Sequence, residues 1–414
     1  MSAVINTSND NLAWSTEQEV CEVPYQVFTD KEIYDKEQQN IFRGDNWSFV
    51  ALEVEVPKSG DYKTTYIGDT PVIVMRDEEG QINVVVNSCA HRGAAVCREL
   101  RGNTPNLECV YHQWAYNLKG ELIGVPFRRG IKGNGGMPQS FDMKAHFLQR
   151  LRVGSVAGLV FASFSEKVES LEDYLGPMTV AAIKRICNKP IKILGDQRQY
   201  VHGNWKLYAE NTRDPYHASL LHLFHMTFGL YRSSQKGLNH MDEEKRHSLL
   251  TASKGTDEGT EDFKDMRSFN TDFSLQDPSI LAGRKEFDDD VTLVILSVFP
   301  NVILQQIANT LAVRQICTKG VKGFELVWTQ FGYEDDDHEM DLIRMKQGNL
   351  IGPAGLISME DGEAVEIVHD SIVREEDRSS YIAMGGGKAE DADHLVTESG
   401  IVGFWKYYRK VMGY

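Results

Sequence analysis

Ser88–Trp114, with the sequence SCAHRGAAVCRELRGNTPNLECVYHQW, contains two thiols and two imidazoles in two mirrored pairs. Cys89 and His91 form a Cys-x-His pair, and Cys109 and His112 form a Cys-x-x-His pair after a long gap. Zinc sites of this composition usually present two cysteines followed by two histidines, whereas each loop here supplies one of each. A [2Fe–2S] cluster with two cysteines on one iron and two histidines on the other matches the mirrored order. The stretch therefore favours such a cluster, with structural zinc and no metal as the alternatives.

The region around these loops consists of short β-branched runs interrupted by glycine, aspartate and proline. Examples are WSFVALEVEV from Trp47 and INVVVNSC from Ile82. Runs of this kind are typical of strands, and they continue to about residue 160. The pattern predicts an all-β domain over residues 41–160 with the Cys/His loops at two hairpin tips.

The rest of the chain has a mixed pattern. SLEDYLGPMTVAAIKR from Ser170 and GIVGFWKYYRKVMG from Gly400 have helical spacing. VTLVILSVFPNVILQQIANTLAVRQICT from Val291 is typical of successive long strands. We therefore expect a large, mostly antiparallel sheet backed by helices, and a surface loop or lid at the polar stretch 252–277.

The composition argues against several classes of partner. The formal net charge of −16 does not suit nucleic acid or an anionic membrane, because both bind basic surfaces. No apolar run approaches the ~20 residues that a membrane-spanning helix needs. The N-terminus lacks the basic and apolar regions of a secretory signal, and the six cysteines are few and scattered. We therefore expect a soluble cytoplasmic protein.

A second group of potential ligands lies further along the chain. Asp214, His217 and His222 form the pattern Asp-x-x-His-x4-His. Two histidines at this spacing lie about 140° apart around an ideal helix, so both can reach one metal only if the helix is broken. Glu360 and Asp361 supply neighbouring carboxylates, and two histidines with one carboxylate on one face of Fe(II) leave positions open for O₂. The alternative is that both histidines are ordinary core or surface residues.

The motifs CAHRG and CVYHQW resemble the Rieske domain in the large (alpha) subunit of ring-hydroxylating non-haem iron oxygenases. The gap between them has the length usual in that family, and the resemblance extends over nearly the whole chain. It implies that Cys89, Cys109, His91 and His112 hold a Rieske [2Fe–2S] cluster.

The resemblance also implies a fold. An all-β Rieske [2Fe–2S] domain at residues 41–160 is followed by a helix-grip catalytic domain at 161–414, in which helices cover an antiparallel sheet. Residues 1–40 are expected to form an N-terminal segment that packs on the catalytic domain. The expected class is therefore α+β.

The iron ligands follow from the same resemblance. In this family the sequence GPAG lies a few residues before the aspartate that binds the mononuclear iron. GPAG at 352–355 selects Asp361 rather than Glu360 as the partner of His217 and His222.

The family pattern gives Asp214 a different task, as a bridge between metal centres. The implied bridge joins His217 to a Rieske histidine of the neighbouring subunit, with His112 as the first candidate and His91 as the alternative. This arrangement implies a trimer of alpha subunits, commonly with three small beta subunits (α3β3, or α3 without them). His225 is not used by the family pattern, and we expect it to be structural.

The resemblance implies oxygenation with O₂ at Fe(II) and two electrons from NADH through a separate reductase, with or without a ferredoxin. No G-x-G-x-x-G sequence opens a helix after a strand, so the chain carries no nicotinamide signature of its own. Within the family it most resembles salicylate 5-hydroxylase, anthranilate or 2-halobenzoate dioxygenase, and terephthalate dioxygenase. The expected reaction is dioxygenation of an ortho-substituted benzoate such as anthranilate, 2-halobenzoate or salicylate. The alternatives are monohydroxylation of salicylate, dioxygenation of terephthalate, and, at a greater distance, a non-enzymatic metal-binding or electron-transfer protein.

A carboxylate in an apolar pocket needs a cation or several hydrogen-bond donors. Arg314 is the first candidate, and Gln306 and Asn309 on the same predicted sheet are the next ones. Relatives of the terephthalate type carry an arginine just before GFW in the tail, where this chain has Val402. This departure argues for a substrate with one carboxylate.

Overall fold

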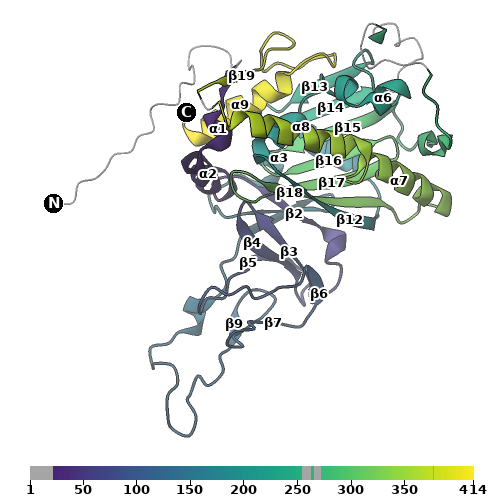
Figure 1. Ribbon diagram of the computed structural model, residues 1–414. Coiled ribbons are helices and arrows are strands. Elements are labelled where there is room, and N and C mark those ends of the chain that lie inside the picture. The colour runs from purple at the N-terminus through teal and green to yellow at the C-terminus, as the bar shows by residue number, and fades with distance from the viewer. Residues whose placement is uncertain (1–21, 254–262, 265–271, 376) are drawn as a thin grey trace.

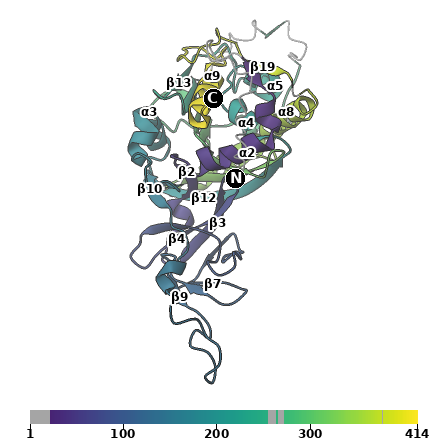
Figure 2. The same ribbon diagram turned by 90° about the vertical axis from the view of Figure 1, so that its left-hand side faces the viewer.

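The Cys/His loops belong to an all-β domain that projects from a larger body (Figures 1 and 2). The computed structural model describes residues 22–414 apart from 254–262, 265–271 and 376, so most of the expected loop or lid at 252–277 lies outside the described residues. This all-β region contains three small antiparallel sheets, with strand orders β10-β11-β2, β5-β4-β3-β6 and β7-β8-β9, of which the first packs against the larger body. Its strands are β2 (Ser48–Leu52), β3 (Asp61–Ile67), β4 (Thr70–Arg76), β5 (Ile82–Val86), β6 (Arg101–Asn103), β7 (Leu107–Glu108), β8 (Ala115–Tyr116), β9 (Leu122–Gly124), β10 (Arg152–Val156) and β11 (Leu159–Ser163).

The larger body is built on one seven-stranded antiparallel sheet with the order β12-β18-β17-β16-β15-β14-β13. Most neighbours in this order are also neighbours in sequence, which is typical of hairpin connections. The strands are β12 (Ile191–Val201), β13 (Gly237–Met241), β14 (Ser248–Ser253), β15 (Val291–Val298), β16 (Val302–Ile307), β17 (Thr310–Thr318) and β18 (Phe324–Tyr333).

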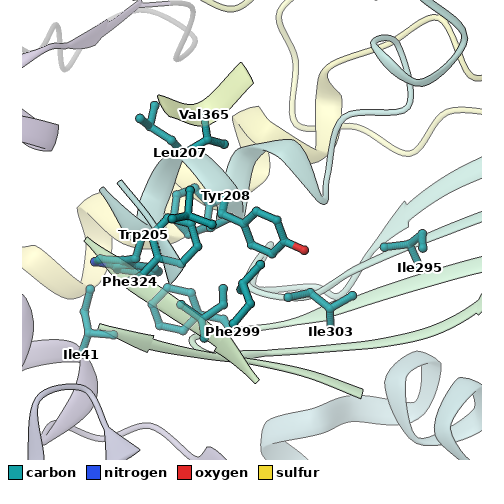
Figure 3. Packing of buried hydrophobic residues seen from close by; sticks show 14 of the residues in the cluster. Ile41, Trp205, Leu207, Tyr208, Ile295, Phe299, Ile303, Phe324 and Val365 are labelled. Atoms are coloured by element: carbon teal, nitrogen blue, oxygen red, sulfur yellow. The ribbon is translucent and has the colours of Figure 1, made fainter. Parts of the chain in front are cut away.

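Both faces of this sheet are covered, because alternate side chains of each strand point to opposite sides. Leu293 and Ile295 of β15 belong to the core under helices α4, α8 and α9, whereas Val294 and Leu296 belong to the core under α3. The helices are α3 (Leu171–Ile186), α4 (Trp205–Asn211), α5 (Ala218–Leu221), α6 (Leu223–Thr227), α7 (His338–Ile351), α8 (Leu356–Ile372) and α9 (Ser399–Met412). Trp205 and Tyr208 of α4 lie over sheet residues in Figure 3.

The expected α+β class is confirmed. The predicted boundaries near residues 40 and 160 remain predictions. In the described part of the chain, no helix combines the length and the apolar character that crossing a bilayer requires.

The described part of the N-terminal segment lies against the larger body. Strand β1 (Glu22–Pro24) pairs with β19 (Ser379–Tyr381), and the ring of Phe28 packs edge-on against Trp405 with 5.5 Å between ring centroids. Residues 1–21 of the predicted segment lie outside the described residues. The short elements not yet named are α1 (Gln26–Thr29), α2 (Lys31–Glu37), the π-helical turn η1 (Gln38–Phe42) and the 3₁₀ turns η2 (Glu53–Glu55), η3 (Met143–His146) and η5 (Pro278–Leu281).

A buried carboxylate at the end of α2 joins three parts of the chain. Glu37 Oε1 lies 2.7 Å from Lys206 Nζ of α4, and neither side chain is exposed. Trp205 Nε1 donates to Glu37 Oε2 (2.9 Å), and the Tyr408 hydroxyl of α9 donates to Oε1 (2.5 Å). Burial lowers the pKa of Lys206, and the negative charge of Glu37 opposes that effect. The pair therefore ties the N-terminal segment and the last helix to the helix that leads into the second motif.

Candidate metal centres

The two Cys/His loops adopt the same backbone turn. The amide of Gly93 donates to the Cys89 carbonyl, and the amide of Gln113 donates to the Cys109 carbonyl, both at 2.8 Å. Gly93 and Gln113 both have positive φ, 75° and 55°. The two loops therefore share the turn that follows the cysteine, although the histidine comes two residues after Cys89 and three residues after Cys109.

The cysteines and histidines of these loops differ in burial. Cys89 and Cys109 are buried, His91 is exposed and His112 is half-buried. The two imidazole rings lie side by side, with 4.5 Å between centroids, and His91 stacks on Trp114 at 4.7 Å. The predicted ligands are thus brought together with sulfur inside and nitrogen at the surface.

Tyr116 closes the inner side of this site. Its hydroxyl lies 3.2 Å from Cys89 Sγ and accepts a hydrogen bond from the amide of Ala90 (3.1 Å). Hydrogen bonds to cluster sulfurs are one of the means by which proteins adjust the reduction potential. The spacing of Tyr116 from the loops did not reveal this contact.

The second motif follows α4 and is interrupted where its spacing required. His217 precedes α5, and His222 lies between α5 and α6 with φ −89° and ψ 79°, outside helical values. The break turns both Nε2 atoms toward Asp361 Oδ1 of α8, at 3.4 Å from His217 and 3.2 Å from His222. One ligand atom from each of these three side chains lies within 4.8 Å of the others.

Each histidine also has a carboxylate at its other ring nitrogen. Nδ1 of His217 lies 3.3 Å from Asp214 Oδ2, and Nδ1 of His222 lies 2.7 Å from Glu360 Oε2. Such contacts orient a metal-binding imidazole and raise its basicity. Glu360 was set aside in favour of Asp361 as a ligand, and its contact with His222 could not be seen in the sequence.

The electrostatics of the three side chains suit a cation. Burial opposes a charge on His217, but the contacts with Asp214 and Asp361 outweigh it and raise its pKa to about 10. Burial likewise opposes a charge on His222, and Asp361 and Glu360 raise its pKa. Burial would raise the pKa of Asp361, but the two histidines hold it well below its usual range.

In apo-protein prepared with a chelator, Fe(II) binding at pH 7 is expected to release at least one proton. His217 is protonated below its pKa of about 10, whereas an imidazole that binds metal must be neutral. The apparent affinity for Fe(II) should therefore rise with pH, by roughly tenfold per unit for each displaced proton. Calorimetric titration in buffers of different ionisation enthalpy counts the protons, and a pH-independent affinity would contradict this charge state.

A cavity of about 60 Å³ adjoins the three side chains. Most of its lining is apolar, as with Leu293, Ile295 and Ile307, and Arg314 is one of its few charged groups. Arg314 is 6% exposed. Its guanidinium donates to Gln305 Oε1 (2.6 Å) and to the Tyr208 hydroxyl (2.9 Å) and lies 4.4 Å from the Trp328 ring centroid. Arg314 thus lies in the wall of the cavity beside the three side chains.

The structure places Gln306 and Asn309 away from the metal ligands. Both line a separate cavity of about 700 Å³, where Gln306 accepts a hydrogen bond from Arg185 (2.6 Å). The cause is strand alternation: Arg314 faces Ile303 across the β16–β17 ladder, so Gln305 shares its face and Gln306 points to the other side. Gln305 is the residue that the sequence interpretation missed.

His225 of α6 lines the cavity beside the metal ligands, although we expected it to be structural. Its side chain is 2% exposed, and its Nε2 has no hydrogen-bond partner among the described residues. Burial, together with the positive charge on His222, lowers the pKa of His225 to about 3. The imidazole is therefore neutral.

The sequence matches two known protein families. Residues 46–134 match the Rieske [2Fe-2S] domain, and residues 187–413 match the ring hydroxylating alpha subunit (catalytic domain). The chain is 52% identical over 395 residues to the anthranilate 1,2-dioxygenase large subunit of Burkholderia cepacia (95% of this chain, 93% of that protein). It is 48% identical to the terephthalate 1,2-dioxygenase terminal oxygenase component subunit alpha 2 of Comamonas sp (94% and 95%). It is 43% identical to the salicylate 5-hydroxylase large oxygenase component of Ralstonia sp (94% and 94%).

Solved structures show the same fold. Naphthalene 1,2-dioxygenase from Rhodococcus sp. superposes with a TM-score of 0.79 at 24% identity, over 94% of both chains. The cofactors of the matched domains are a Rieske [2Fe–2S] cluster and a mononuclear iron.

The side chains of the two sites fit these groups. Two imidazoles and a carboxylate are donors that Fe(II) accepts in oxygenases. Among the described residues, this trio is the one group of at least three metal-binding side chains at single-ion spacing. The two cysteines and two histidines of the first site do not converge in this way, and a [2Fe–2S] cluster does not require it because its ligands bind two different irons. With matched domains that span most of its length, the chain belongs to the Rieske non-haem iron ring-hydroxylating oxygenases, as a large (alpha) subunit.

Proposed function

We propose that this alpha subunit oxygenates the ring of a small aromatic carboxylate. One observation carries the proposal: a buried guanidinium, that of Arg314, lines the cavity beside His217, His222 and Asp361. Its neighbours Gln305 and Tyr208 are uncharged hydrogen-bond partners. Within the described part of the chain, no carboxylate lies at ion-pair distance from Arg314. A buried cation without a counter-charge is costly, and a substrate carboxylate supplies that charge.

The assignment of ligands is part of this proposal. Cys89 and Cys109 would hold one iron of the cluster, and His91 and His112 would hold the other. The burial of the thiols and the exposure of the imidazoles support this order. His217, His222 and Asp361 hold the mononuclear Fe(II), which, when bound, supplies the position at which O₂ is activated.

The residues around the iron ligands orient them and exclude water. Glu360 accepts a hydrogen bond from His222 Nδ1, and Asp214 Oδ2 lies 3.3 Å from His217 Nδ1, while both Nε2 atoms face Asp361. Asn211 Nδ2 donates to Asp361 Oδ1 (3.0 Å) and keeps that carboxylate in place. Arg314 fixes the carboxylate of the substrate, and the apolar walls surround the ring.

The substrate is an ortho-substituted benzoate such as anthranilate, 2-halobenzoate or salicylate. The similar proteins named for anthranilate, terephthalate and salicylate all act on aromatic carboxylates. Val402 is fully buried in α9 and supplies no second cation for a second carboxylate. The proposed reaction is dioxygenation, which with anthranilate yields a diol that expels ammonia and CO₂ to give catechol. Monohydroxylation of salicylate is the alternative that the Ralstonia relative favours.

Alpha subunits of this family work with a reductase or ferredoxin and often with beta subunits. For this chain we propose NADH as the electron source, through a separate reductase, and an α3β3 or α3 assembly in the cytoplasm. With both groups bound, Asp214 would lie on the electron path between neighbouring subunits, because its carboxylate contacts His217. The separation of the β7–β9 tip from the helices of the larger body supports a path between subunits (Figures 1 and 2).

Product analysis with the reconstituted reductase tests the function. The panel contains benzoate, anthranilate, 2-chlorobenzoate, salicylate, terephthalate, naphthalene and biphenyl. We expect oxygenated products from the ortho-substituted benzoates. A preference for naphthalene or biphenyl over every benzoate would contradict the proposed class of substrate. It would not affect the assignment of the two metal sites.

Arg314→Leu is expected to weaken substrate binding in particular. A charge-assisted hydrogen bond is worth about 1.5–3 kcal/mol, so KM for benzoates should rise roughly ten- to a hundredfold, with a smaller change in kcat. Arg314→Lys keeps the charge without the planar fork and should give an intermediate loss. Steady-state kinetics with benzoates and with an uncharged arene make the comparison. An equal loss on both kinds of substrate would show that Arg314 only supports the fold.

A further inference from the structure

His225 leaves a polar atom unused beside the iron ligands. Its imidazole is 2% exposed, and Nε2 lacks a hydrogen-bond partner among the described residues. A buried polar atom without a partner costs about 1–3 kcal/mol, a cost that an aliphatic side chain at this position would not carry. Packing alone therefore does not account for a histidine here.

The arrangement of the neighbouring side chains excludes a ligand role for His225. The trio that converges at single-ion spacing consists of His217, His222 and Asp361. The ring of His225 lies 5.6 Å from that of His222, measured between centroids. His225 lines the same cavity without joining the ligand set.

The cavity thus offers a substrate two different polar groups besides the metal ligands. The guanidinium of Arg314 suits a carboxylate, whereas the unpaired Nε2 of His225 suits an uncharged group that forms hydrogen bonds. Leu250, Leu293, Ile295 and Ile307 make the adjoining walls apolar. If the carboxylate of a substrate is bound by Arg314, an amino or hydroxyl substituent on the same ring needs a second hydrogen-bond partner in the cavity.

We propose that His225 Nε2 forms a hydrogen bond with an amino or hydroxyl group ortho to the carboxylate of the substrate, and so selects these benzoates. The inference rests on the proposed function and extends it to a specificity-determining residue. An amino or hydroxyl group can both donate and accept, so it pairs with either tautomer of the imidazole. A halogen or a methyl group at the same position leaves Nε2 unpaired. Sites built to pair with a polar group discriminate against analogues that lack it, because the protein atom then stays unsatisfied.

The test combines two substrates with three proteins. Anthranilate and 2-methylbenzoate have ortho groups of similar size, but only the amino group forms hydrogen bonds. The ratio of kcat/KM for anthranilate to kcat/KM for 2-methylbenzoate is measured in the wild type, His225→Leu and His225→Asn. We expect the ratio to fall about tenfold in His225→Leu and to recover in part in His225→Asn.

Two controls separate the outcomes. Iron content and the Rieske spectrum of each variant show whether the neighbouring His222 still binds metal. If a variant loses iron, the proposal is tested on the wild type alone. A wild type whose kcat/KM for anthranilate does not exceed that for 2-methylbenzoate overturns the proposal. An unchanged ratio in iron-loaded His225→Leu also overturns it. If the wild type converts no benzoate at all, the proposed function has failed, and the inference falls with it.

Discussion

Cys109→Ser is expected to remove the visible absorption of the purified protein and its turnover together. Cys109 is 2% exposed, and its backbone is held by hydrogen bonds to Gln113 and Trp114, so the substitution changes the ligand atom and leaves the loop in place. A hydroxyl does not replace a cluster thiolate, and without the cluster no electrons reach the iron. Absorption spectra, iron and sulfide analysis and NADH-coupled oxygen uptake make the measurement. We expect activity at background level.

Cys97→Ser is the matched control for this variant. Cys97 lies in the same domain, and burial raises the pKa of its thiol to about 11, so it stays protonated. This variant should keep both the colour and the activity. A colourless wild type that contains stoichiometric zinc would contradict the cluster assignment itself.

Asp214→Ala is expected to leave the Rieske spectrum intact. The turnover rate should fall roughly ten- to a hundredfold. Asp214 Oδ2 lies 3.3 Å from His217 Nδ1, and its Oδ1 accepts the backbone amides of Tyr216 (2.8 Å) and His217 (3.2 Å). The substitution therefore frees the imidazole and loosens the turn that carries it. It also removes the proposed link to the neighbouring subunit.

Asp214→Asn separates the loss of the turn from the loss of the carboxylate charge. The amide oxygen of asparagine can still accept the hydrogen bonds from the backbone amides, whereas the negative charge is lost. The measurement is the rate at which a pre-reduced cluster is reoxidised in the presence of substrate and O₂. A slow rate in both variants supports the electron route. Normal turnover of Asp214→Ala with the natural reductant would show that electrons take another path.

The spacing within the Cys/His pairs and within the His217/His222 pair could be interpreted from the sequence because it is a local property, whereas Asp361 was selected through the family resemblance. The turn from Cys89 to Gly93 and the turn from Cys109 to Gln113 each fix a thiol and an imidazole within a few residues. The broken helix at His222 also followed from spacing alone. In such motifs the spacing of the residues along the chain determines how close their side chains lie.

The residues that were missed depend on contacts between distant segments. VILQQI in β16 is buried at every position, so no alternation of polar and apolar residues indicates which glutamine shares the sheet face of Arg314. The pairing of Arg314 with Ile303 decides in favour of Gln305. The contact of His222 with Glu360, 138 positions later, likewise appears only when α8 is placed beside α6. Pocket residues are therefore predicted less well than metal ligands, because register and helix packing place them.

The ion pair between Glu37 and Lys206 has a consequence for the synthesis of the protein. Glu37 and Lys206 leave the ribosome long before Tyr408, whose hydroxyl completes the surroundings of the carboxylate. Until α9 packs against them, both charges are expected to remain in water, because burying them without all their partners is unfavourable. Lys206 belongs to α4, which leads directly to Asp214 and His217. The segment that carries Asp214 and His217 therefore reaches its final position only once α9 has packed against α4.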